Sequence, residues 1–75
     1  MAQSIKNTKK IRYFFESGDH CVWAMQLISK KMPSILINSS EANPTGRYLF
    51  VQSSLTDAER MQLASWVEMY GGTRA

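Results

Sequence analysis

Asp19-His20-Cys21 places a carboxylate, an imidazole and a thiol side by side, and these are groups that nucleophilic catalysis uses. In a helix, however, consecutive residues do not face one another, so these three side chains cannot align as a relay among themselves. His20 is the only histidine, and the chain has neither a glycine-rich phosphate loop nor a Ser/His/Asp spacing. We therefore predict that the protein is not an enzyme and uses no cofactor.

Cys21 is the only cysteine, so the chain cannot form an internal disulfide, and no Cys-x-x-Cys pair is present to build a zinc site. We expect no metal ion. A lone cysteine, together with a polar and basic start that lacks an apolar signal segment, predicts a cytoplasmic protein. No apolar run approaches the roughly 20 residues of a membrane helix, so no membrane interaction is expected.

Periodicity and turn residues predict one small α+β domain whose elements follow the order β-α-β-β-α. Strands are predicted over residues 11–16, 34–38 and 47–53. Helices are predicted over residues 19–32 and from the capping box at residues 56–59 to about Tyr70. The segment 34–38 is short, β-branched and apolar, which is typical of a strand in the middle of a sheet. The loop that follows it predicts a hairpin between the second and third strands.

Each of these elements has a predicted core face. Alternation along the first strand separates two sets of side chains, namely Ile11, Tyr13 and Phe15 on one face and Arg12, Phe14 and Glu16 on the other. The apolar stripes of the two helices comprise Cys21, Ala24, Met25, Ile28 and Met32 in the first, and Leu63, Trp66, Val67 and Tyr70 in the second.

The predicted architecture is a two-layer domain. A strand-helix-strand unit favours parallel strands with a right-handed crossover, so both helices would pack on one face of a three-stranded sheet. The other face would be open or covered by a second copy of the chain, which would give a homodimer. We expect residues 1–10 to form a flexible basic arm, residues 11–72 to form the single domain and residues 73–75 to be a short tail.

Four large apolar side chains lie off the predicted stripes. Trp23 and Leu27 adjoin on the first helix, and Met61 and Met69 lie in a similar row on the second. Trp is enriched at binding hot spots and Met suits adaptable contacts, although each could instead pack on a loop or fill a gap in the core. Because a chain of 75 residues has a small core, this surplus indicates a partner surface.

Our first hypothesis is therefore a protein-binding module, such as a modulator or inhibitor that docks on a larger protein or complex. A phage or mobile-element accessory protein would fit this plan. The two lysines at the end of the first helix would form the rim of the binding surface. The candidate partner-binding residues are Trp23, Leu27, Lys30, Lys31, Met61 and Met69.

The alternative hypothesis is a nucleic-acid-binding protein that stacks single-stranded bases on an open sheet face. Depending on which side of each strand is buried, that face would carry Arg12 and Phe14 or Tyr13 and Phe15, beside either Tyr48 and Phe50 or Arg47. The run Lys/Arg-Gly-Phe/Tyr-Gly/Ala-Phe, which is the RNP1 pattern of RNA-binding sheets, does not occur in this chain. The net charge of +3 is concentrated in the first 12 residues. Both observations weigh against this alternative. Its candidate residues are Lys6, Lys9, Lys10, Arg12, Phe14 and Arg47.

Overall fold

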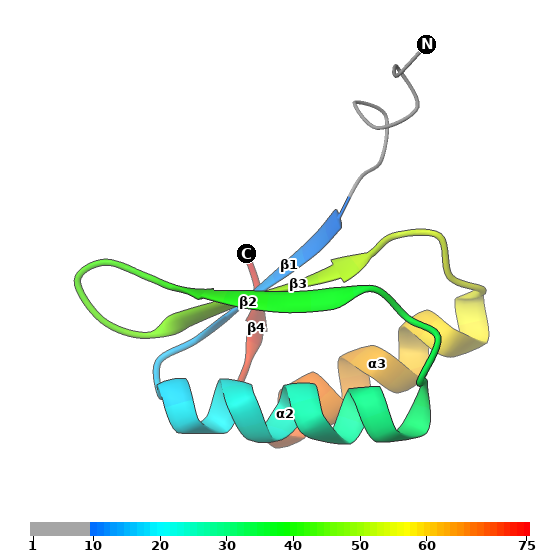
Figure 1. Cartoon of the computed structure of the whole chain (residues 1–75), viewed down its shortest axis with the longest axis horizontal. Helices are drawn as coiled ribbons and strands as arrows, with labels where there is room; N and C mark the ends of the chain where they lie inside the picture. Colours follow the sequence, from blue (N-terminus) through cyan, green and yellow to red (C-terminus); the bar gives the residue numbers. More distant parts are fainter. Residues whose placement is uncertain (1–9) are drawn as a thin grey trace, which may run out of the picture.

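A four-stranded antiparallel sheet lies over two helices in the computed structural model, which describes residues 10–75 (Figure 1). The strand order across the sheet is β2-β3-β1-β4. Both helices cover the same side of the sheet, as predicted for a two-layer α+β domain. In chain order the elements are β1 (Lys10–Phe15), α2 (Gly18–Lys31), β2 (Ile37–Glu41), β3 (Arg47–Gln52), α3 (Asp57–Met69) and β4 (Thr73–Arg74).

The prediction of three strands is wrong, because the residues expected to be a tail form a fourth strand. Phe14 pairs with Thr73 and Tyr13 pairs with Arg74, and the amide of Ala75 donates a 2.9 Å hydrogen bond to the carbonyl of Arg12. A strand of two residues shows no alternation along the sequence. Its pairing with β1 depends on the chain reversal after α3, which brings the C-terminus back to the sheet.

The prediction of a mid-sheet strand over 34–38 is also wrong, because β2 begins three residues later and lies at the edge of the sheet. The apolar run around Ile35 belongs to the turn that leaves α2. The amide of Ile35 donates to the carbonyl of Met32, and the Ile35 side chain packs against the core from this turn. Leu36 is 71% exposed.

The strand-helix-strand unit is split by a third strand. β1 and β2 both pair antiparallel with β3, so they are parallel to each other but do not touch as neighbours. The predicted hairpin of β2 and β3 is confirmed. The complete order of six elements, with β3 between β1 and β2, is the split β-α-β arrangement known as ferredoxin-like.

The core lies between the sheet and the helices. The alternation predicted for the first strand is confirmed, since Ile11, Tyr13 and Phe15 are buried and Arg12 is exposed. Leu49 and Val51 of β3 bury the same side of the sheet. The buried core residues are Ile11, Tyr13, Phe15, Cys21, Ala24, Ile28, Leu49, Val51, Leu63 and Val67.

Polar caps fix where the helices begin. The Ser17 hydroxyl accepts a hydrogen bond from the amide of His20 at the start of α2. At the start of α3, the Thr56 hydroxyl accepts from the amide of Glu59 at 3.1 Å, and the Glu59 carboxylate accepts from the amide of Thr56 at 2.9 Å. This confirms the predicted capping box.

Neither helix described here has the length and apolar character that crossing a bilayer requires.

Candidate functional site

No other described element covers the side of the sheet that faces away from the helices (Figure 1). Because side chains alternate along each strand, this side carries the residues that lie between the buried positions. We call it the open sheet face. Its residues are Lys10, Arg12, Phe14, Asn38, Ser40, Tyr48, Phe50, Gln52 and Thr73.

Three aromatic rings lie next to one another on the open sheet face. Phe14 and Tyr48 are direct partners across β1 and β3, and their ring centroids are 5.6 Å apart with an interplanar angle of 59°. Tyr48 and Phe50 lie two residues apart on β3, with ring centroids 6.2 Å apart. All three side chains are half-buried, so each ring keeps part of its surface accessible. The result is a continuous aromatic row.

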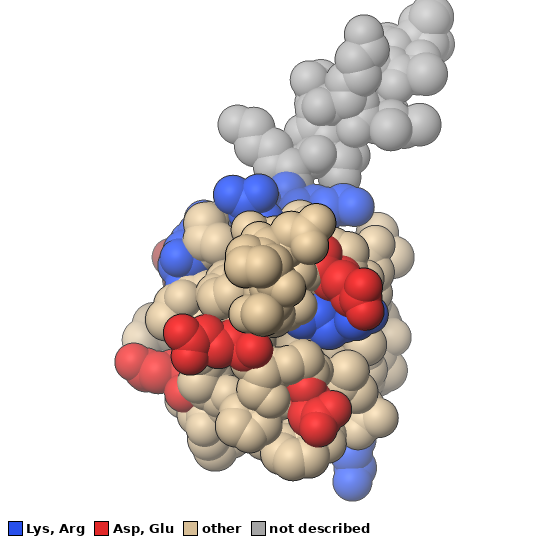
Figure 2. Space-filling view, turned by 90° about the vertical axis from the view of Figure 1, so that its left-hand side faces the viewer, with Lys and Arg blue, Asp and Glu red and all other residues tan. Residues whose placement is uncertain are grey.

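Cationic side chains lie beside this aromatic row. The guanidinium carbon of Arg12 is 5.2 Å from the centroid of the Tyr48 ring, which is a cation–π arrangement. Lys10, Arg12 and Arg74 line a shallow hollow of about 450 Å³ together with Phe50 and the C-terminal Ala75. No strand position on the open sheet face carries a carboxylate. Figure 2 shows Lys and Arg gathered along the top of the molecule, while lower down in the same view basic and acidic side chains are mixed.

Of the residues that the sequence assigns to a nucleic-acid site, three lie on the open sheet face and one of the described residues does not. Lys10, Arg12 and Phe14 are all on the open sheet face. Arg47 instead lies on the helix side, where its Nε donates a 3.1 Å hydrogen bond to the Ser39 hydroxyl. The predicted residues Lys6 and Lys9 lie outside the residues that the structure describes.

The residues of the predicted protein-binding surface lie on different sides of the helical layer. On α2, Trp23 is 50% exposed with its ring 5.2 Å from that of His20, and Leu27 is half-buried. Met61 and Met69 of α3 are 74% and 64% exposed. Lys30 and Lys31, the predicted rim, are also exposed.

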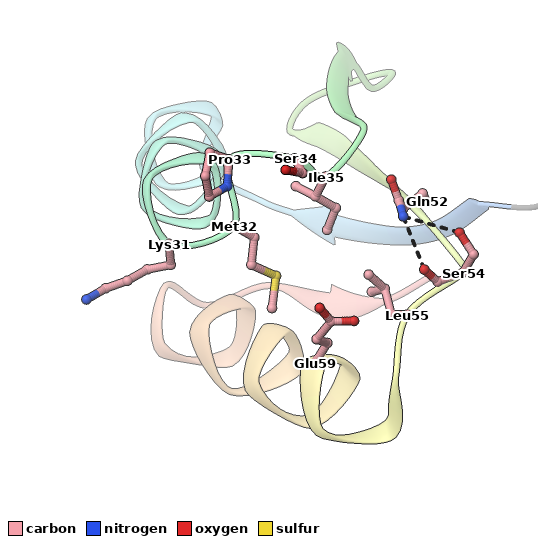
Figure 3. A pocket seen from close by; sticks show the side chains of 9 residues that line it. All are labelled: Lys31, Met32, Pro33, Ser34, Ile35, Gln52, Ser54, Leu55 and Glu59. Carbon is pink, nitrogen blue, oxygen red and sulfur yellow. Dashed lines mark hydrogen bonds between the residues drawn. The ribbon is translucent and has the colours of Figure 1, made fainter.

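The orientation of α2 explains why these two pairs do not form one patch. Met32 points from the end of α2 toward α3 (Figure 3). Trp23 precedes Met32 by nine residues, which is about two and a half turns of a helix at roughly 100° per residue. The two side chains therefore point in opposite directions from the helix axis. The Trp23 side of α2 therefore points away from α3. The structure does not bring Trp23 together with Met61 and Met69.

A hollow of about 310 Å³ lies where α2 ends and α3 begins (Figure 3). Met32, Ile35 and Leu55 supply its apolar lining. The Glu59 carboxylate at its edge is already engaged in the capping box. Of the predicted partner-binding residues, this hollow includes Lys31 alone, and the Lys31 side chain extends away from it.

The residues with catalytic side chains have different environments. Asp19 and His20 are exposed, whereas Cys21 is fully buried and its Sγ lies 3.9 Å from the carbonyl oxygen of Tyr48, to which it donates. Burial raises the pKa of the Cys21 thiol, and the nearby charge of Arg47 opposes this shift. Residues 10–75 contain no group of three or more His, Cys, Asp or Glu side chains placed to hold a metal ion.

Sequence reasoning named Tyr48 and Phe50 only under the condition that their side of β3 is open. It missed Leu36 and Asn38, which line a hollow on this side of the sheet. It also missed Arg74 of the edge strand β4, which borders the hollow of Lys10 and Arg12 but pairs with the buried Tyr13. The alternation of Tyr48 and Phe50 around the apolar Leu49 was the available indication, because Leu49 is the residue that the core buries. Comparisons of this chain with protein families, curated proteins and solved structures give no match.

Proposed function

We propose that the protein binds single-stranded nucleic acid through the open sheet face. The observation that carries this proposal is the aromatic row of Phe14, Tyr48 and Phe50 with Arg12 and Lys10 beside it. Unpaired bases stack on accessible aromatic rings whatever their identity, and nearby cations attract the phosphates between them. A duplex hides the faces of its bases, so this surface suits a single strand.

The departure of β3 from the RNP1 pattern does not remove this capacity. Tyr48, Phe50 and Val51 match the spacing of two aromatic residues and a valine in that pattern. Gly46 and Ser53 stand where the pattern has a basic and an aromatic residue, and Arg47 and Leu49 stand where it has small residues. Both of these side chains point to the helix side, where Leu49 is buried and Arg47 bonds to Ser39. The stacking positions themselves are aromatic.

The direct test is fluorescence anisotropy with a labelled single-stranded oligonucleotide and its duplex. We expect the single strand to bind more tightly. Replacing Phe50 with Ala should weaken single-strand binding by about 5- to 150-fold, because one base–aromatic stack contributes about 1–3 kcal/mol. Trp23→Ala is the matched control, since it removes an exposed aromatic side chain from α2 instead. Equal binding by all three proteins, or no binding by the unmodified chain, would refute the proposal.

A second candidate function is the docking of a larger protein on the helical layer, as a modulator or inhibitor. The observation that favours it is the exposure of Trp23, Met61 and Met69, which are large apolar side chains with no covering element in the described residues. Affinity capture with the unmodified protein, Trp23→Ala and Met69→Ala tests it. Because Trp23 and Met69 do not share a patch, loss of a partner by either variant at unchanged thermal stability supports docking on that helix, and partners retained by both variants argue against it.

A homodimer through the open sheet face would compete with the proposed function, because a second copy would cover the aromatic row. Sedimentation equilibrium distinguishes the two. We expect the protein to sediment as a monomer with its aromatic row accessible. A stable dimer that Phe50→Ala dissociates would instead assign this face to self-association.

A further inference from the structure

A second hollow, of about 280 Å³, lies on the β2 side of the open sheet face. Its lining combines apolar walls with amide side chains, which is the composition of sites that enclose a small aromatic ligand. Leu36 projects beside it and is the most exposed large apolar residue on this side of the sheet. The lining residues are Lys10, Leu36, Ile37, Asn38, Phe50 and Gln52.

The strand register fixes how these side chains surround the Phe50 ring. Phe50 has two direct cross-strand partners, with Asn38 on the β2 side and Arg12 on the β1 side. Directly opposed side chains in a sheet have Cβ atoms about 5 Å apart. A planar ring stacked on Phe50 therefore has its edge within reach of the Asn38 amide. Leu36, two residues before Asn38, borders the same space.

The two amide side chains of this hollow differ in their hydrogen bonds. The Gln52 side chain is fully engaged within the protein, because its Oε1 accepts from the backbone amide of Leu36 at 2.8 Å. Its Nε2 donates to the carbonyl and the hydroxyl oxygens of Ser54 at 3.1 and 3.2 Å, as Figure 3 shows. Gln52 thus holds Leu36 in place. Asn38 is exposed, and no hydrogen bond joins its side-chain amide to another residue of the described chain.

We infer that this hollow is a base-binding subsite selective for adenine, in which the base stacks on Phe50 against Leu36 and Asn38 reads its edge. This inference rests on the proposed function. An Asn amide offers one donor beside one acceptor, which matches N6 and N7 of adenine. Asn38 is inferred to meet this N6/N7 edge, because the Watson–Crick edges of all four bases pair a donor with an acceptor and would not distinguish adenine. Guanine presents two adjacent acceptors, O6 and N7, to the same amide.

Lys10 completes the subsite. It lines this hollow and also the neighbouring hollow formed with Arg12 and Arg74. Lys10 therefore borders both the adenine subsite and the rest of the basic surface. A phosphate that links an adenine on Phe50 to the next nucleotide would meet the Lys10 charge, and the strand would continue over Tyr48 and Phe14.

The test compares binding of unlabelled 12-nucleotide oligo(dA), oligo(dC) and oligo(dT) by competition, a length chosen from the about 4–16 nucleotides that single-strand sites cover. We expect oligo(dA) to bind about 5- to 150-fold more tightly, which is the discrimination of one bidentate contact. Asn38→Asp replaces the amide donor with an acceptor and should abolish this preference. Asn43→Asp, in the exposed turn between β2 and β3, makes the same charge change away from the subsite and should preserve it.

Each outcome decides a different statement. Equal binding of the three oligonucleotides, a preference for another base, or an adenine preference that survives Asn38→Asp overturns the inference and leaves the proposed function standing. Failure of every oligonucleotide to bind overturns both. Competition by AMP as effective as that by oligo(dA) at equal base concentration would assign the subsite to a free nucleotide and overturn its assignment to a strand.

Discussion

The Arg12 guanidinium lies over the Tyr48 ring, so one residue pair supplies both a cation and a stacking surface. An exposed cation–π contact contributes about 0.5–1 kcal/mol. This is small enough for Arg12 to leave the ring when a phosphate offers a stronger, charge-assisted contact. The Tyr48 ring would then be available to a base. Residue chemistry on this face therefore combines positive charge with aromatic surface without any carboxylate among the strand positions.

The buried thiol of Cys21 predicts a loss of stability at alkaline pH. Burial raises its pKa in the folded protein, so the folded state keeps a proton that the unfolded chain releases. The corresponding stability is fully present below about pH 8.5, the ordinary value for a thiol, and is lost as the pH rises through the folded-state pKa. Burial also raises the pKa of Tyr13, which adds the same trend above about pH 10.

Urea denaturation between about pH 7 and pH 10 measures this effect, and Cys21→Ala isolates it. The variant is expected to be less stable at neutral pH, because it leaves a small void in the core. Its free energy of unfolding should fall less steeply with pH than that of the unmodified protein. Parallel curves for the two proteins would show that the thiol does not contribute to the alkaline slope.

At the scale of elements, the capping box makes the start of α3 a separable contribution to stability. Thr56→Ala removes the hydroxyl that accepts from the amide of Glu59. We expect the free energy of unfolding to fall by about 1 kcal/mol, within the range of about 0.5–2 kcal/mol for such caps. Ser65→Ala, at an exposed position inside the same helix, is the control and should be neutral or slightly stabilising. Equal loss in both variants would contradict a specific role for the cap.

Elements defined by local patterns were predictable, and those defined by distant pairing were not. The capping box at Thr56 and the β1 alternation are properties of a few consecutive residues, and the sequence predicts both helices and β1 to within a residue or so. β4 has two residues and exists through its pairing with β1. The apolar run 35–37 predicts a central strand, but Ile35 reaches the core from a turn.

The same division applies to the candidate site. Alternation along β1 places Arg12 and Phe14 on one face whatever the fold, and this grouping was predictable. Which face stays open depends on where the helices pack, so the sequence left Tyr48 and Phe50 conditional. Asn38 had no pattern of its own, because its role follows from its register opposite Phe50. Arg47 was misplaced because strand parity at the β3 start puts it with Leu49 on the helix side.

At the scale of the whole molecule, the layers separate two kinds of surface. The sheet side carries Lys10 and Arg12 with the aromatic row, and the helix side carries the exposed Trp23 and the α3 methionines. These surfaces face opposite directions, because the sheet forms one layer of the molecule and the helices form the other (Figure 1). A nucleic-acid strand bound to the sheet and a protein bound to the helices would not exclude one another sterically. Each candidate function can therefore be tested with substitutions that leave the other surface intact.

The salt dependence of binding tests the sheet side as a whole. Each cation that meets a phosphate of a single strand adds about 0.7 to the slope of log affinity against log salt concentration. Arg12→Gln should therefore weaken oligonucleotide binding at low salt and make that slope shallower by about 0.7. Lys30→Gln removes an exposed charge from α2 and should change neither quantity. A slope that Arg12→Gln leaves intact, or one that Lys30→Gln reduces equally, would mean that phosphates do not meet the open sheet face.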